Sequence, residues 1–433
     1  MLSDSLENSP KILNLSAQEF ADKLQSIYGK NQQASATLMA DMDDFIDMEA
    51  AAREVEQGSD LLDGSDDAPV IKLLNAILLE ALNDKASDVH IEPYENEARV
   101  RFRLDGVLRS VLSPSVHIAP FLISRIKVMA RLDIAEKRLP QDGRMSVKLG
   151  SRSIDLRVST MPSSYGERVV MRLLDKQATH LDLNDLGMKE SIRHKMADLI
   201  SRPHGIVLVT GPTGSGKTTT LYAALEQIDQ QQLNIMTVED PVEYDLQGIS
   251  QTQINTRAGM SFAKGLRALL RQDPDVILIG EIRDQETAEI ATQASLTGHL
   301  VFATLHANSA VGTVTRLQDL GVDNLLLAST IRGILAQRLV RKLCDAYKLQ
   351  HDGVIYQAHG CEQCNQTGYQ GRIGLFELVI VDDQVQQLMH SNAGEVELEN
   401  YIRTQTPSIL QSGYDLVTNG QTTMDEILRV TAS

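Results

Sequence analysis

The segment from Gly211 to Thr218 combines residue types at the spacing that binds nucleotide phosphates. It reads Gly-Pro-Thr-Gly-Ser-Gly-Lys-Thr, a complete phosphate-loop pattern. Its glycines let backbone N–H groups approach phosphate oxygens, Lys217 suits the β and γ oxygens, and the Thr218 hydroxyl suits magnesium. An apolar run at 206–209 leads in and a helix-forming run at 219–228 leads out, which opposes a plain flexible turn. The predicted nucleotide-binding residues are Gly211, Pro212, Thr213, Gly214, Ser215, Gly216, Lys217, Thr218 and Thr219.

Further side chains suited to phosphoryl transfer each follow an apolar run. These runs lie at 235–238, 276–279 and 300–305. Glu239 follows the first run, Glu281 follows the second after one glycine, and His306 follows the third. Because the carboxyl ends of parallel strands share one sheet edge with the phosphate loop, we expect these side chains to converge. Glu239 is predicted to polarise the attacking water and Glu281 to hold magnesium together with Thr218, although these two roles could be exchanged.

Histidines and acids beside strands also have structural roles. His306 is predicted to sense the γ-phosphate or to link subunits, whereas His299, which faces the other way in a continuous strand, is predicted to be structural. Asp284 precedes a helical run and is predicted to cap that helix.

The elements that position these residues indicate an α/β protein. An amphipathic helix opened by Pro69 spans 70–82, and alternating strands follow, such as 98–104 and 154–158. They predict a small α+β domain, PAS-like in class. From Gly205 onward, apolar strands alternate with helices, which predicts a RecA-like P-loop domain with a mostly parallel central sheet.

Three regions are therefore expected in the 433 residues: a helical remnant with an acidic linker at 1–67, the α+β domain at 68–180, and the P-loop domain at 181–433. The first region has an amphipathic stretch at 17–28 and an acid-rich segment at 41–67 whose only base is Arg53. That segment is predicted to be a solvated linker, with a partner-docking segment as the alternative. The last region ends in a cysteine knuckle near 344–364 and a helical C-terminal part.

Composition narrows the functional classes. A formal net charge of -17 opposes binding to nucleic acid phosphates. The chain offers neither an apolar leader nor about 18 consecutive apolar residues, so membrane contact is expected only through partners. All three cysteines lie late in the chain, which predicts a reducing compartment rather than a disulfide framework.

Four segments, in order, resemble the Walker A, aspartate, Walker B and histidine boxes of secretion ATPases. They are 211–220, 237–244, 266–284 and 297–306. Upstream, the runs 86–93 and 139–144 are similar to the second N-terminal domain of that family. Thr237-Val238-Glu239-Asp240-Pro241-Val242-Glu243-Tyr244 and the cysteine cluster resemble type II secretion more than pilus assembly.

The resemblance implies a homohexamer that binds ATP or ADP with magnesium, lies in the cytoplasm and is peripheral to an inner-membrane platform. It also implies that Arg157 and Arg172 reach the nucleotide from the preceding domain, with Arg144 and Arg168 in reserve. An exposed strand face, with Asp155 and Glu167 as partners of these arginines, is the alternative.

The cysteine region departs from the family pattern of two Cys-x-x-Cys pairs. Cys361 and Cys364 form an intact pair, but Tyr347 stands where the mate of Cys344 is expected. Three thiolates with His351 or His359 could hold zinc, and a metal-free knuckle is the alternative.

The predicted function is Mg-ATP hydrolysis that powers type II protein secretion through domain motions. A type IV pilus assembly ATPase and a nucleotide-gated scaffold with little turnover are the alternatives. From the resemblance we also expect a first N-terminal domain that is shorter than usual in this family, and a platform contact that differs or needs a companion subunit.

Overall fold

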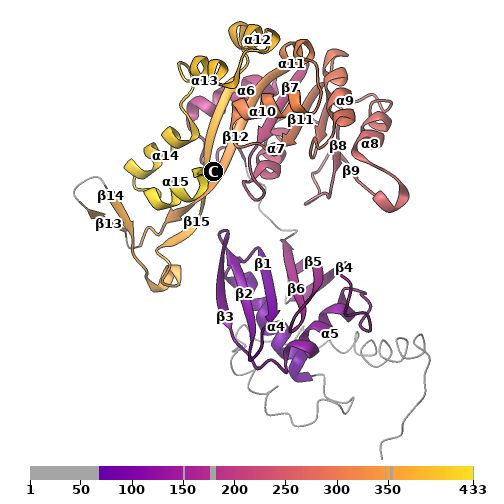
Figure 1. The fold of residues 1–433 in the computed structure, drawn as a ribbon, viewed down its shortest axis with the longest axis vertical. Coiled ribbons are helices and arrows are strands. Elements are labelled where there is room, and N and C mark those ends of the chain that lie inside the picture. The colour runs from indigo at the N-terminus through magenta and orange to yellow at the C-terminus, as the bar shows by residue number, and fades with distance from the viewer. Residues whose placement is uncertain (1–67, 150–151, 176–181, 347, 352–354, 433) are drawn as a thin grey trace, which may run out of the picture. The chain divides into compact units, whose positions relative to one another are not determined.

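The computed structural model describes residues 68–149, 152–175, 182–346, 348–351 and 355–432 (Figure 1). The predicted helix at 17–28 and the acidic segment at 41–67 lie outside these residues. Two compact units divide the chain, Met1–Ala178 and Thr179–Ser433.

The described part of the first unit is a six-stranded antiparallel sheet in the order β3-β2-β1-β6-β5-β4. Its elements are α4 (Ala68–Asn83), β1 (Asp88–Pro93), β2 (Ala98–Leu104), β3 (Val107–Leu112), α5 (Ala119–Met129), β4 (Gln141–Leu149), β5 (Arg152–Ser163) and β6 (Gly166–Asp175). Alternation sends one set of apolar side chains, including Phe102, Leu156 and Met171, into a core with α4 and α5. The predicted α+β architecture is confirmed.

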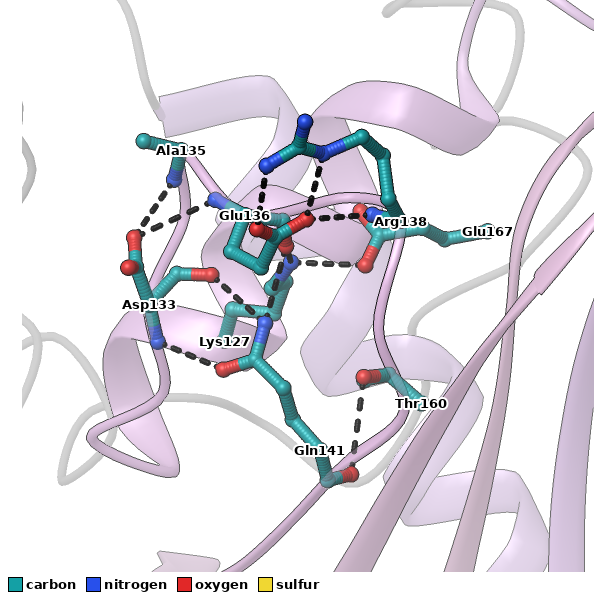
Figure 2. A network of polar contacts seen from close by, with 8 residues as sticks. All are labelled: Lys127, Asp133, Ala135, Glu136, Arg138, Gln141, Thr160 and Glu167. Atoms are coloured by element: carbon teal, nitrogen blue, oxygen red, sulfur yellow. Dashed lines mark hydrogen bonds and ion pairs between the residues drawn. The ribbon is translucent and has the colours of Figure 1, made fainter.

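A buried lysine fixes the loop between α5 and β4. Lys127 Nζ donates to the Glu136 main-chain oxygen at 2.7 Å and to the Glu167 carboxylate at 2.6 Å, as Figure 2 shows. Gln141 accepts from the Asp133 backbone N–H at 2.8 Å and donates to the Asp133 carbonyl at 2.9 Å. The loop is therefore bonded to Lys127 of α5 and to Gln141 of β4, and Lys127 in turn joins α5 to β6.

The second unit contains a seven-stranded sheet in the order β15-β12-β7-β11-β10-β8-β9, and a two-stranded sheet of β13 and β14. Its strands are β7 (Gly205–Thr210), β8 (Ile235–Glu239), β9 (Ser250–Gln253), β10 (Val276–Ile279), β11 (Leu300–Leu305), β12 (Ile331–Leu343), β13 (Lys348–His351), β14 (Ile355–Ala358) and β15 (Tyr369–Ile380). Its helices are α6 (Glu190–Ile200), α7 (Lys217–Leu225), α8 (Phe262–Leu269), α9 (Gln285–Leu296), α10 (Ala310–Asp319), α11 (Asn324–Thr330), α12 (Asp383–His390), α13 (Glu395–Ile402), α14 (Ile409–Thr418) and α15 (Met424–Thr431), with short 3-10 turns at Thr256–Ala258 and Glu362–Cys364.

Helices cover both faces of this sheet (Figure 1). One face packs against α6 and α7, and the other packs against α8 to α13. All neighbouring strands in the large sheet run parallel except β12 and β15. The predicted mostly parallel sheet is confirmed, and the antiparallel edge strand β15 is a feature that the sequence pattern did not reveal.

Candidate nucleotide-binding site

The phosphate loop connects the carboxyl end of β7 to the N-terminus of α7. Gly211, Gly214 and Gly216 adopt φ angles of 148°, 79° and 86°, which L side chains rarely adopt. The loop also lies against β12, because a Cβ on Gly211 would come within 2.4 Å of the Gln337 main-chain oxygen. Lys217 is the first residue of α7, so the unpaired backbone N–H groups of the helix start at the loop.

The loop carries a polar atom that suits an anionic ligand. Ser215 is 3% exposed, and its Oγ has no hydrogen-bond partner within the described part of the chain. A buried hydroxyl without a partner costs free energy that a phosphate oxygen would recover. Thr218 and Thr219 are half-buried in the first turn of α7, whereas Pro212 and Thr213 are exposed. The residues present therefore fit a bound phosphate group.

The Lys217 ammonium lies inside this loop. Its Nζ donates to the main-chain oxygens of Gly211 at 2.8 Å and Pro212 at 3.1 Å. Burial lowers the pKa of Lys217 to about 8, the Glu281 carboxylate opposes that shift, and the Arg338 guanidinium adds to it. A triphosphate beside this ammonium would favour its charged form.

Glu281 and His306 meet at the sheet edge beside the loop. β10 and β11 are parallel neighbours, and these residues follow their carboxyl ends. Oε1 of Glu281 lies 3.1 Å from Nε2 of His306, and Oε2 accepts a hydrogen bond from Arg283 Nε at 2.5 Å. The Glu281 side chain is 17% exposed and the His306 side chain 45% exposed. Both therefore remain accessible to a ligand near Lys217.

Glu239 ends β8 in a buried network. It is 2% exposed and accepts hydrogen bonds from the Tyr222 hydroxyl, from Thr237 Oγ1 at 2.6 Å and from Gln251 Nε2 at 3.3 Å. Burial raises the pKa of this carboxyl, while the three donors favour its charged form. Tyr222 and Gln251 were missed in the sequence. Tyr222 carries a hydroxyl within the apolar second half of α7, which is a weak signal, and nothing in the sequence pointed to Gln251.

Two further missed residues, Gln337 and Arg338, support the loop from β12. Thr220 Oγ1 donates to Gln337 Oε1 at 2.8 Å. Arg338 is 4% exposed and donates to the main-chain oxygens of Asn308 at 2.7 Å and Val430 at 3.2 Å. Burial lowers the pKa of Arg338. The only sequence signal was this polar pair within an otherwise apolar run.

The residues expected to be structural have local partners. Asp284 accepts from the Thr287 backbone N–H at 2.8 Å and caps α9, as predicted. His299 precedes β11, so it lies at the sheet edge opposite to His306, and its Nδ1 is 2.8 Å from the Ala294 main-chain oxygen.

The two predicted arginines lie in the first unit. Arg157 in β5 is directly opposite Arg172 in β6. Arg172 Nε donates to Asp88 Oδ1 at 2.9 Å. Glu167, which the sequence pattern suggests as a partner of these arginines, instead forms the buried ion pair with Lys127, because it lies on the helix-covered face of β6.

The three cysteines form one cluster. Cys344 Sγ is 3.7 Å from Cys361 Sγ, which is 3.6 Å from Cys364 Sγ. Cys364 Sγ also accepts hydrogen bonds from the backbone N–H groups of Cys361 at 3.2 Å and Gly368 at 3.1 Å. These donors help to lower the pKa of Cys364 to about 7 against the opposing effect of burial. The set suits a thiophilic metal. Tyr347 lies outside the described residues.

Residues 63–429 match the protein family described as Type II/IV secretion system protein. The chain is 54% identical to the "Type II secretion system ATPase E" of Vibrio cholerae over 97% of the chain and 87% of that relative. It is 53% identical to the "Type II secretion system protein E" of Pseudomonas aeruginosa over 95% and 85%, respectively.

Solved structures share the fold. The pilus retraction motor PilT with bound ADP has a TM-score of 0.60 at 28% identity, over 83% of this chain and 97% of that one. The Legionella pneumophila ATPase DotB has a TM-score of 0.63 at 20% identity, over 83% and 95%.

Proposed function

Because this chain belongs to the Type II/IV secretion system protein family, we propose that it is an ATPase that powers protein secretion through a type II secretion system. The observation that carries the proposal is that Lys217 of a complete phosphate loop lies near Glu281. His306 lies 3.1 Å from the same glutamate, so the three side chains gather beside the loop. Phosphoryl transfer needs positioning and charge neutralisation at one point more than covalent chemistry, and these groups supply both.

The chain's own residues divide the work as follows. The loop N–H groups, Ser215 and Lys217 would bind the phosphates of ATP, and Thr218 with Glu281 would hold the magnesium ion. That ion would neutralise negative charge that develops during phosphoryl transfer. The sequence pattern assigns Glu239 to the water and Glu281 to the metal. The geometry favours Glu281 for the water as well, since Glu281 is accessible beside His306 while three donors already bind Glu239.

Arg157 and Arg172 of the first unit are proposed to bind the γ-phosphate, so that the first unit responds to its presence. Guanidinium groups suit this role because they are always charged and bind phosphate oxygens in pairs. ATP hydrolysis would then become a rigid-body motion of one unit against the other. We expect Arg157→Ala to hydrolyse ATP slowly and to bind nucleotide almost normally. Unchanged turnover would leave this arginine with a structural role only.

We further propose a homohexamer in the cytoplasm that is peripheral to the inner membrane and contacts platform proteins there. Among the described helices, none is long and apolar enough to cross a bilayer. A pull-down of the cytoplasmic partner, repeated with residues 1–60 deleted, tests the docking segment directly.

A zinc ion on Cys344, Cys361 and Cys364 belongs to the same proposal. The three sulfurs lie within 4.8 Å of one another, as ligands of one metal must. The sequence offers His351 or His359 as a fourth ligand, but His359 is not among the described groups that lie within this distance, so its side chain would have to move to bind the ion. The ion would crosslink β12 to the turn before β15.

Two variants test the motor. Lys217→Ala should abolish ATP hydrolysis, and a purified variant that keeps the parent rate would remove the central assignment. Glu281→Gln should bind ATP, fail to turn over and fail to restore secretion in cells lacking the protein. Restored secretion would favour the nucleotide-gated scaffold, because a motor must complete its cycle. Loss of surface fibres rather than exoprotein export in those cells would favour the pilus ATPase.

A further inference from the structure

Asp88 is a buried acid on the sheet face opposite to the helices of the first unit. It begins β1 and lies directly opposite Arg172 of β6 in the antiparallel pair. The residue is 4% exposed. Its Oδ1 accepts from Arg172 Nε at 2.9 Å, its Oδ2 accepts from Ser87 Oγ at 2.8 Å, and Arg103 Nε lies 3.5 Å from Oδ2. The carboxylate is therefore held from several sides.

The contact uses only one end of the Arg172 guanidinium. The Arg172 side chain is 56% exposed. Within the described residues, its hydrogen bond to Asp88 comes from Nε, and neither Nη nitrogen donates to a protein group. The buried Asp88 carboxylate thus fixes Nε of Arg172, while the two Nη nitrogens of the guanidinium stay available for a second anion.

Arg172 has positive neighbours on its other side. Arg157 is directly opposite it in β5, and Arg144 is directly opposite Arg157 in β4. Like charges directly opposite one another on adjacent strands repel. Asp88 is the acid that completes this cross-strand row beside Arg172. Without the Asp88 carboxylate, Arg172 Nε would lose the acceptor that fixes it, and the long side chain could adopt other rotamers.

We propose that Asp88 is a positioning residue that fixes Nε of Arg172 and thereby orients the terminal nitrogens of this arginine for its proposed contact with the γ-phosphate. The inference rests on the proposed function of Arg172, and it adds a group that acts through that arginine without touching the nucleotide. Misplacing a charged group by about 1 Å is enough to slow a reaction strongly.

The test is a double-mutant cycle on the full chain with Asp88→Asn, Arg172→Ala and the double variant. Asp88→Asn should lower kcat roughly tenfold, the effect of weakening a hydrogen bond between charged groups. The KM for ATP should change little. The double variant should be no slower than Arg172→Ala alone, because Asp88 has nothing left to position. Additive losses in kcat, or an Asp88→Asn variant with the parent kcat, would overturn the inference.

Two controls distinguish positioning from a folding role of Asp88. Arg103→Ala removes the other arginine beside Asp88, and a loss of kcat equal to that of Asp88→Asn would indicate a general folding role and overturn positioning. If Asp88→Asn does not fold, Ser87→Ala replaces it in the cycle, with a smaller loss that must again vanish beside Arg172→Ala. An Arg172→Ala variant with the parent turnover would instead defeat the proposed role of Arg172 itself.

Discussion

The phenol hydroxyl of Tyr222 donates a hydrogen bond to the carboxylate of Glu239, and this bond joins α7 to the end of β8. Tyr222 is fully buried, and burial together with the negative charge of Glu239 raises its pKa well above the usual value. The helix that begins at the phosphate loop is thus coupled to β8, which lies three positions away in the sheet from β7, the strand that leads into the loop.

Replacing Tyr222 with phenylalanine should destabilise the chain by about 1–3 kcal/mol, because a buried carboxylate loses one of its donors. The variant should also raise the pKa of Glu239 further. A carboxyl whose pKa is raised in the folded state lowers the free energy of unfolding at pH values where the group is ionised in the unfolded chain. The loss of unfolding free energy in the variant should therefore be larger at pH 7 than at about pH 5. Urea unfolding at both pH values measures this. Tyr414→Phe, at an exposed tyrosine, is the matched control, and equal losses in the two variants would contradict the prediction.

Nucleotide affinity should fall as the pH rises through the pKa of Lys217, which burial lowers to about 8. The charged ammonium binds phosphate, so between about pH 7 and pH 9 the Kd for ADP should rise roughly tenfold. Isothermal titration gives the profile. Glu281→Gln removes the carboxylate that opposes the lowering of the Lys217 pKa, so the Kd of this variant should begin to rise at a lower pH. A Kd that stays constant over this range would mean that the lysine remains charged throughout.

The phosphate loop and the strand ends were predictable because each is a local pattern. Gly211 to Thr218 is continuous in sequence, and parallel strands place Glu239, Glu281 and His306 at one edge. The secretion ATPase family was also predicted, and the comparisons confirm it.

Residues that act across the fold could not be predicted in this way. Gln251 reaches Glu239 from the edge strand β9, and Arg338 supports the loop only because β12 pairs with β7. Asp88 meets Arg172 only because the antiparallel sheet places β1 beside β6. Periodicity gives the strands but does not give their order in the sheet.

Metal content should depend on the three cysteines together. The purified chain should carry about one zinc per molecule, and Cys361→Ser should lose most of it, because Cys361 lies between the other two sulfurs. Elemental analysis and thiol titration measure this. Tyr347→Cys should tighten the binding by restoring a fourth thiolate. A metal-free parent chain with three freely titrating thiols would support the metal-free knuckle instead.

Glu426 should stabilise the second unit in a pH-dependent way. It is 2% exposed and receives hydrogen bonds from Arg341 and Arg429, which lower its pKa to about 2 against the effect of burial. Because the folded pKa lies below the ordinary glutamate value of 4.5, this stabilisation is complete above that value and is lost as the pH falls toward 2. Its full size is about 3 kcal/mol.

Glu426→Gln removes this stabilisation, so its deficit in unfolding free energy relative to the parent should shrink by about 1 kcal/mol between pH 7 and about pH 3.5. Urea unfolding of both chains at the two pH values gives the difference. Asp425→Asn changes an exposed acid in the same helix and should show no such trend. A Glu426→Gln deficit that is independent of pH would show that the two arginines do not hold this carboxylate in its charged form.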